Sequence, residues 1–303
     1  MTDHDTVGDG LAVYLYGVAR GLDPAALDGT AGVGGAPVRT VVHTGAAGAL
    51  TALVSTVRLD QYGEAALREN LEDLAWLEET ARAHHDVVDR AAHAAPTAPV
   101  RIATIYRDDA RVAQVLAEQG DRFAQALDRV AGRAEWGVKA YAHREALEAA
   151  QTPEPSASAA PAPQSGAGGA GTAYLRRRQD ERRRRADAGR KVSEQAAAIH
   201  DGLAELAVAA RHHPPQDPKL SGRDGVQILN AAYLLEDGDA DAFAEAARAA
   251  GERWPGIEVE VTGPWPPYSF IDTTDPAPET ETGPGPGAEA GAGSVRAAEG
   301  AVR

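Results

Sequence analysis

The first part of the chain contains three strand-like runs followed by a helical pattern of apolar residues. The runs LAVYLYGVA (11–19), PVRTVVHT (37–44) and LTALVSTVRL (50–59) predict β-strands. The short TGAAGA segment between the last two runs favours a hairpin. From about Glu64 the apolar residues recur every three or four positions, which predicts an amphipathic helix. Its apolar stripe consists of Leu71, Leu74, Leu77, Ala81, His84 or His85, Val88 and Ala92.

One more strand and one more helix complete this first unit. PTAPVRIATIY (96–106) breaks the helical pattern at its prolines and predicts a short strand. Residues 108–132 predict a single helix, which is capped by Asp108 or Asp109 and ends at Gly132.

The second part of the chain has the element order strand, helix, strand, strand, helix, strand. This βαββαβ order is typical of a ferredoxin-like sandwich. No proline interrupts the helical pattern from Tyr174 to about Arg211, so the first helix of this unit is unusually long. The predicted elements are strands at 135–143, 219–223, 226–236 and 256–263, and helices at 174–211 and 239–254.

We therefore predict an α+β protein of two domains, the second a modified ferredoxin-like sandwich with an extended first helix. The domains cover residues 11–133 and 134–272, after a disordered leader at residues 1–10. Residues 151–171 are rich in Pro, Ala, Gly and Ser, and residues 273–303 are acidic and rich in Pro and Gly. Both segments lack the apolar side chains needed for a core, which predicts a flexible insert and a disordered tail.

The two halves of the long helix differ in pattern. The second half has apolar residues alternately four and three positions apart, which predicts a packed seam. The first half, LRRRQDERRRRADAGRK, has no such seam after Leu175, so we expect it to protrude. The seam consists of Val192, Ala196, Ile199, Leu203, Leu206 and Ala210.

Composition restricts the chemistry of the protein. The net charge of −15 opposes binding to nucleic acid or to anionic lipid. Cysteine is absent, which excludes disulfides, thiolate catalysis and thiolate-bound metals. No apolar run is long enough to span a bilayer, and the acidic N-terminus does not have the pattern of a signal peptide. These features predict a cytoplasmic protein.

The histidine pairs do not predict a metal site. His84 and His85 are adjacent on a helix and point about 100° apart, so we expect one at the margin of the core and one in water. His85 and His93 share a stripe but lie about 12 Å apart along the helix axis, too far to bind one ion. His212 and His213 lie at the predicted helix end, where we expect them to cap it.

The sequence also lacks the motifs of common catalytic and cofactor sites. It contains no GxxxxGKS/T phosphate loop and no Gly-x-Ser-x-Gly nucleophile motif. We therefore predict no catalytic residue, no metal and no cofactor, and a protein that is not an enzyme.

The strongest charge feature is the arginine-rich stretch 176–191. It carries a local charge of +6 and leaves −21 on the rest of the chain. One interpretation is a nucleic-acid-binding regulator in which helix 174–191 binds phosphates. The other, which we favour, is a solvated face that meets an acidic protein surface, because no aromatic residue is interleaved for base stacking.

The stretch GPWPPYSF (263–270) collects aromatic side chains near the end of the folded region. Because proline lacks an N–H donor, we expect Gly263 and Pro264 to end the preceding strand. The aromatic residues either cover the sheet and the domain junction, where Trp136 also lies, or form an exposed patch for a partner. The candidate partner contacts are Trp265, Pro266, Pro267, Tyr268, Arg176, Arg177 and Arg178.

Several blocks of this sequence together resemble one known family. They are LYGVA near the start, LAWLEETARAHHDVVD, WGVKAY, GTAYLRRR and VEVTGPWPPYSFID. In their order and spacing they resemble the gas vesicle protein F/L family over about residues 11–272. The insert at 151–171 and the tail after residue 272 lie outside the resemblance.

The resemblance implies a role in building gas vesicles, the hollow protein-walled organelles that give buoyancy. Members of the family have two α+β domains and are accessory or minor structural proteins without known catalytic residues. The implied partners are the small, hydrophobic major shell protein and other gas vesicle accessory proteins, and the implied location is the gas vesicle and the cytoplasm. Nucleic acid and membranes are not expected partners. A small-molecule enzyme on a ferredoxin-like scaffold would need a polar pocket that the sequence does not indicate.

Overall fold

The computed structural model describes residues 10–143, 170–216 and 225–271. All of the described residues belong to one compact unit. The expected leader, insert and tail fall almost entirely outside the described residues. The expected strand at 219–223 lies wholly outside them.

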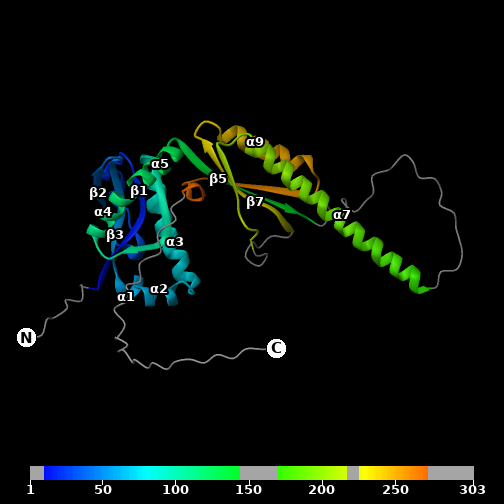
Figure 1. The fold of residues 1–303 in the computed structure, drawn as a ribbon, viewed down its shortest axis with the longest axis horizontal. Helices are drawn as coiled ribbons and strands as arrows, with labels where there is room; N and C mark the ends of the chain where they lie inside the picture. The colour runs from blue at the N-terminus through cyan, green and yellow to red at the C-terminus, as the bar shows by residue number, and fades with distance from the viewer. Residues whose placement is uncertain (1–9, 144–169, 217–224, 272–303) are drawn as a thin grey trace, which may run out of the picture. The chain divides into compact units, whose positions relative to one another are not determined.

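The first sheet is antiparallel and has the strand order β2-β3-β1-β4. Figure 1 labels its strands β1, β2 and β3. Its β2–β3 hairpin pairs Gly45 with Gly48, and Gly48 has a φ of 88°, which suits glycine in a tight turn. The three predicted strands and the hairpin are confirmed. The strands are β1 (Leu11–Ala19), β2 (Val38–Gly45), β3 (Gly48–Arg58) and β4 (Thr97–Tyr106).

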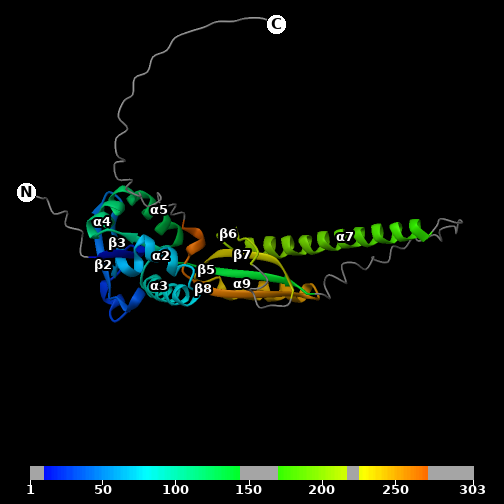
Figure 2. The same ribbon diagram turned by 90° about the horizontal axis from the view of Figure 1, so that it is seen from below.

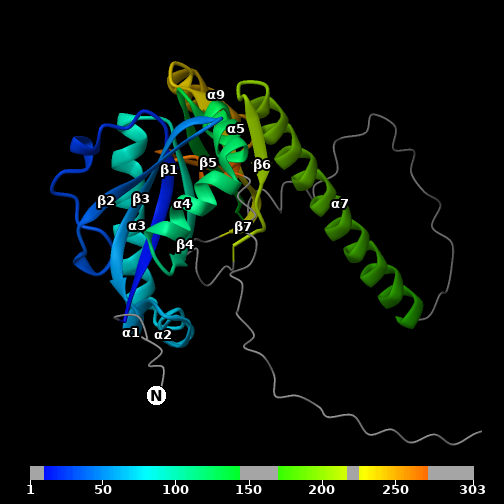
Figure 3. The ribbon, with the colours of Figure 1, turned by 60° about the vertical axis from the view of Figure 1, so that its left-hand side comes forward.

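Both faces of the first sheet are covered by helices (Figure 3). One face packs against α4 (Asp109–Glu118) and α5 (Gly120–Val130), and the other against α3 (Leu74–Ala94) and the short η1 (Pro24–Leu27). In the central strand β1, Val13 and Leu15 point to the first of these faces, while Tyr14 points to the second. This double burial explains why the sequence of β1 is continuously apolar.

The amphipathic helix expected from Glu64 onward is interrupted. The structure contains α1 (Leu59–Tyr62) and α2 (Glu64–Asn70), and α3 begins only after Asp73. The Asp73 carboxylate accepts hydrogen bonds from the N–H groups of Ala75 and Trp76, so it caps a new helix. The expected stripe is wrong at its start, since Leu71 is exposed and Leu74 is 78% exposed. The buried face of α3 consists of Thr80, His84, Val87, Val88 and Ala91.

The single helix expected over residues 108–132 is two helices, α4 and α5. The chain leaves the helical conformation at Gln119, where φ is −112° and ψ is 16°. This break allows both helices to keep apolar faces on the sheet, which one straight helix cannot do across a twisted surface. The Asp108 cap is confirmed by the hydrogen bond that its carboxylate accepts from the Arg111 N–H.

The second sheet is also antiparallel and has the order β6-β7-β5-β8 (Figure 2). Residues of α7 and α9 pack together on one of its faces, with Tyr233 and Phe243 fully buried between the layers. The strands are β5 (Arg133–Ala142), β6 (Ala209–His212), β7 (Val226–Glu236) and β8 (Ile257–Trp265), and the helices are α7 (Ala170–Ala204) and α9 (Ala240–Arg253).

The long helix α7 ends earlier than its sequence pattern predicts. The N–H of Val208 donates to the Leu234 carbonyl, and the following four residues pair with β7 as strand β6. Pairing with a neighbouring strand thus overrides local helix propensity. The expected seam is confirmed at its four residues from Val192 to Leu203 and is wrong at Leu206 and Ala210, which are exposed.

Two predictions about where a helix and a strand end are wrong. His212 lies in β6 and His213 follows it, so neither caps a helix. Strand β8 continues through Gly263 and Pro264 to Trp265. Proline is tolerated there because β8 is an edge strand of its sheet.

A buried polar network joins two strands of the first sheet to helix α3. The N–H of Ala103 in β4 donates to the Tyr14 hydroxyl (3.0 Å), and this hydroxyl lies 2.9 Å from Nδ1 of His84 in α3. Burial lowers the pKa of His84 to about 4 and raises the pKa of Tyr14. His84 is therefore neutral at neutral pH, and its charging opposes folding.

We predict that His84 makes stability depend on pH between about 6.5 and about 4. Its pKa is lower in the folded chain than the 6.5 of an unfolded histidine, so its contribution is complete above pH 6.5 and is lost as pH falls. The loss approaches about 3 kcal/mol at 1.36 kcal/mol per pKa unit. Urea unfolding of wild type and His84→Asn at pH 7 and pH 4.5 measures it. Equal acid losses in both proteins would contradict the assignment.

Candidate partner-binding site

The aromatic stretch near residue 265 forms a strap that connects the two sheets, which we call the C-terminal strap (residues 266–271). It begins where β8 ends, with Pro266 and Pro267 both buried, and continues as the short helix η3 (Tyr268–Phe270). This arrangement agrees with the reading in which the aromatic residues cover the sheet and the junction.

Three side chains of the strap enter three different apolar clusters. Tyr268 packs on the α3 side of the first sheet, whereas Ile271 packs on the α4–α5 side. Because these are opposite faces, the strap passes over the edge of that sheet, and η3 contacts the edge strand β4. Phe270 packs on Ala232 and Leu234 of the second sheet.

Polar groups fix the backbone of the strap. The Glu135 carboxylate accepts hydrogen bonds from the Ser269 N–H (2.7 Å) and the Ser269 hydroxyl (2.6 Å). Nη1 of Arg129 donates to the Phe270 carbonyl (3.3 Å), and Nε2 of His213 lies 3.1 Å from the Ser269 hydroxyl oxygen. Burial raises the pKa of Glu135, and the bonds from Ser269 oppose that shift.

The structure separates the residues that the sequence suggested as partner contacts. Trp265 is 43% exposed and its ring centroid lies 5.4 Å from that of His85. Pro266 and Pro267 are buried, and Tyr268 is half-buried. The other three candidates, Arg176, Arg177 and Arg178, are exposed on α7. That any of these residues contacts a partner stays a prediction.

The second edge of the first sheet, strand β2, is where sequence reasoning found no signal. Its outer residues Val42, Thr44 and Gly45 are exposed. A hollow of about 550 Å³ lies beside the start of β2. It is lined by Pro24, Leu27, Asp28, Gly29, Thr30, Ala31, Gly35, Pro37, Val38, Arg39 and Thr40.

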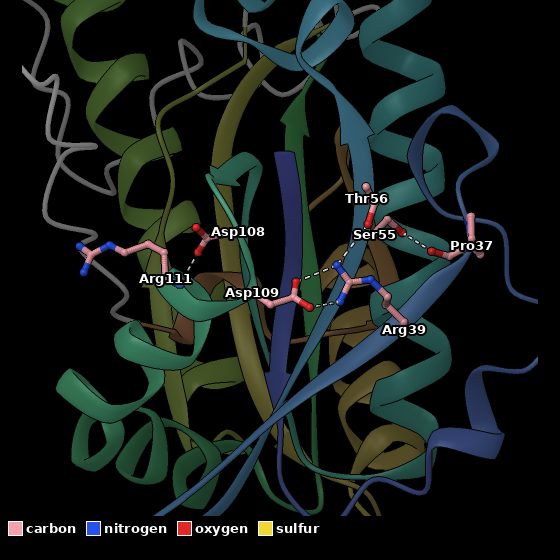
Figure 4. A network of polar contacts seen from close by, with 7 residues as sticks. All are labelled: Pro37, Arg39, Ser55, Thr56, Asp108, Asp109 and Arg111. Atoms are coloured by element: carbon pink, nitrogen blue, oxygen red, sulfur yellow. Dashed lines mark hydrogen bonds and ion pairs between the residues drawn. The ribbon is translucent and has the colours of Figure 1, made fainter. Parts of the chain in front are cut away.

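A network of polar contacts holds β2 in place (Figure 4). Arg39 donates two hydrogen bonds of 2.7 Å to the Asp109 carboxylate at the start of α4, and a third of 3.2 Å to Thr56 in β3. The Ser55 hydroxyl donates to the Pro37 carbonyl (2.9 Å). A bidentate pair of this kind sets geometry more than it adds stability, since both side chains are partly exposed.

The loop that forms one wall of the hollow is tied to the buried face of β1. The N–H of Val33 donates to the Tyr16 hydroxyl, which donates to Ser55. A Cβ at Gly32 would lie 2.0 Å from that hydroxyl oxygen, so only glycine fits. The Gly- and Ala-rich composition of this segment is typical of a loop, but only the fold shows what it packs against.

The histidines do not form a metal site in the described part of the chain. No group of three His, Asp or Glu side chains converges there. His84 lies fully in the core, and His85 packs beside Trp265, so the expectation that one of the pair lies in water is wrong. Nδ1 of His93 lies 2.8 Å from the Asp89 carbonyl oxygen. None of the described helices is long and apolar enough to cross a bilayer.

We predict that the ring of Tyr268, and not its hydroxyl, holds the strap. The hydroxyl is buried without a hydrogen-bond partner among the described residues, and burial raises its pKa. Tyr268→Ala should therefore lower the free energy of unfolding by about 2–3 kcal/mol, whereas Tyr268→Phe should leave it unchanged or slightly higher. Urea unfolding measures both, and an equal loss in the two variants would show that the hydroxyl matters.

Comparison with known proteins shows the same relationship in sequence and in structure. Residues 12–272 match the family described as "Gas vesicle synthesis protein GvpL/GvpF". The chain is 41% identical to gas vesicle protein L of Streptomyces sp. (strain CB03234), over 85% of this chain and 91% of that protein. It is 29% identical to gas vesicle protein F of the same strain, over 86% of this chain and all of that protein.

Solved structures show that the fold is shared. The crystal structure of GvpF from Anabaena sp. PCC7120 matches 88% of this chain and 98% of that one, with a TM-score of 0.61 and 18% identity. GvpF from Microcystis aeruginosa also gives a TM-score of 0.61, at 17% identity, over 86% of this chain and 98% of that one. The mixed α+β fold with two antiparallel sheets is therefore that of GvpF, and the chain belongs to the gas vesicle protein GvpL/GvpF family.

Proposed function

We propose that this protein is a non-catalytic accessory protein of gas vesicle assembly that binds the small, hydrophobic shell subunit. Family membership supports the gas vesicle role. The proposed binding mode is based on one observation, the open edge of the first sheet at strand β2. The protein would hold an aggregation-prone subunit until it is added to the wall, in the cytoplasm and at the gas vesicle, alongside other accessory proteins.

The two edges of the first sheet differ in what covers them. The C-terminal strap crosses the β4 edge and places side chains on both faces. At the β2 edge, Val42 is 58% exposed, and Thr44 and Gly45 are also exposed. An exposed edge strand presents unpaired N–H and C=O groups, to which an extended segment of another chain can add as a further strand.

The hollow beside β2 gives such a strand a place for one side chain. Its lining combines the apolar residues Leu27, Pro37 and Val38 with the polar group of Thr30, whose hydroxyl is buried without a partner in the described structure. Main-chain pairing supplies affinity in this binding mode, and a side-chain pocket supplies selectivity. A segment of a small, hydrophobic subunit suits both features.

We also infer that the second sheet, with α7 and α9, forms a modified ferredoxin-like domain with an extended first helix. The order β6-β7-β5-β8 and the packing of both helices on one face support this assignment. The division into domains at residues 11–133 and 134–272 is part of the same proposal.

A lysine on the β2 edge should weaken binding of the shell subunit. Val42→Lys places a charge where the added strand would pair, and edge lysines oppose such pairing. We expect a rise of about tenfold in the dissociation constant, about 1.4 kcal/mol. Titration of the purified full chain with solubilised shell subunit, checked by co-purification, gives the measurement.

Val226→Lys is the matched control, because Val226 is 56% exposed on the other sheet. It should bind the subunit as wild type does. A wild-type chain that fails to bind would overturn the proposed function. Normal binding by Val42→Lys would place the contact on a different surface.

A further inference from the structure

The N-terminal half of α7 is an exposed, strongly basic helix. Every described side chain from Tyr174 to Asp187 is exposed, and burial begins at Ala188. Figure 2 shows this half of α7 projecting from the second sheet. Its seven arginines point to all sides of the helix, and we refer to them together as the arginine face. They are Arg176, Arg177, Arg178, Arg182, Arg183, Arg184 and Arg185.

The arginine face is not neutralised within the described structure. None of its seven side chains forms a hydrogen bond or an ion pair there, and the first ion pair along the helix is Arg190 with Asp187. Like charges four residues apart, such as Arg178 and Arg182, destabilise a helix. An anionic partner would remove this repulsion, so the charge pattern favours an acidic surface as its ligand.

The helix also carries apolar side chains that none of the other described elements covers. Leu175 is 64% exposed, and Tyr174 beside it is exposed as well. Leu175, Arg178, Arg182 and Arg185 are spaced three, four and three apart, so they share one stripe of the helix. A matching surface would thus combine acidic groups with an apolar contact at one end.

The same chain contains such a surface at the turn between α2 and α3, which we call the acidic corner (residues 69–79). It has five carboxylates and no Lys or Arg, and all five are exposed. Leu71 and Leu74, which the sequence pattern placed in the core, are exposed within it. The carboxylates belong to Glu69, Glu72, Asp73, Glu78 and Glu79.

Two carboxylates of the acidic corner already interact with groups of the same chain, and the other three are available to a partner. Asp73 caps α3 and Glu78 pairs with Arg82. Glu69, Glu72 and Glu79 form no ion pair in the described structure. The corner therefore offers free carboxylates beside exposed leucines, which complements the stripe on α7 in both charge and apolarity.

We propose that the arginine face of one molecule docks on the acidic corner of a second copy of this chain. The two surfaces are different, so the contact is heterologous. In a pair of molecules, one arginine face and one acidic corner therefore stay unoccupied. Further copies add in the same way, giving a head-to-tail assembly. The contact weakens as salt screens the exposed charges. It is separate from the β2 edge and does not depend on the shell subunit.

Charge exchange between the two surfaces tests the proposal in the full chain. Variant A is Arg182→Glu with Arg185→Glu on α7. Variant B is Glu69→Lys with Glu72→Lys in the corner. Sedimentation velocity over a concentration series at low salt measures self-association, and circular dichroism confirms that each variant folds.

We expect wild type to associate with rising concentration and to dissociate as salt is added. Each variant alone should show a dissociation constant about tenfold higher or more. An equimolar mixture of A and B should regain association, because the unchanged arginine face of B meets the unchanged acidic corner of A, and the Glu residues of A meet the Lys residues of B. Arg248→Glu with Arg253→Glu on α9 makes the same net charge change as A and should leave association as in wild type.

Four results would overturn the proposal. They are a wild type that stays monomeric at low salt, a variant A that associates normally, a mixture no more associated than either variant alone, and a control as weak as variant A. A concentration-independent change of shape lost in variant A would instead indicate that the acidic residues 273–303 occupy the arginine face. Low-salt binding of a DNA oligonucleotide, lost in variant A while wild type stays monomeric, would indicate nucleic acid.

Discussion

The packing of Tyr268 and Ile271 on opposite faces of the first sheet is the contact on which the arrangement of surfaces depends. These two side chains carry the strap over the β4 edge, and Phe270 continues it onto the second sheet. Glu135 fixes the backbone between them at Ser269. Where the strap crosses the β4 edge, another strand cannot pair, whereas the outer residues Val42, Thr44 and Gly45 of β2 are exposed.

Charge is distributed unevenly over this scaffold. The net charge is −15, yet the exposed half of α7 is strongly basic. The acidic corner combines carboxylates with exposed leucines, because Asp73 starts a new helix and turns Leu71 and Leu74 away from the core. Surfaces of this kind select a partner by charge and add apolar contact area, which is a different recognition mode from strand pairing at β2.

Local pattern predicted the strands well and the helix ends poorly. Strand β1 was recognisable because both of its faces are buried, and β8 because its alternate residues Ile257, Val259 and Val261 face the core. Helices α3 and α4 start at aspartate caps, of which only Asp108 was recognised. The end of α7 was missed because Val208 pairs with Leu234, a residue distant in sequence, in place of continuing the helix.

The sequence by itself determined the α+β class, the order of the elements and the family, because these depend on periodicity and on short residue blocks. It also located the aromatic strap and the arginine face as unusual segments. Only the tertiary structure decided that Pro266 and Pro267 are buried while Trp265 is exposed, that the strap crosses the β4 edge while Val42 of β2 is exposed, and that Leu74 faces solvent. Those properties depend on contacts between residues far apart in the chain, which the local pattern of residues does not encode.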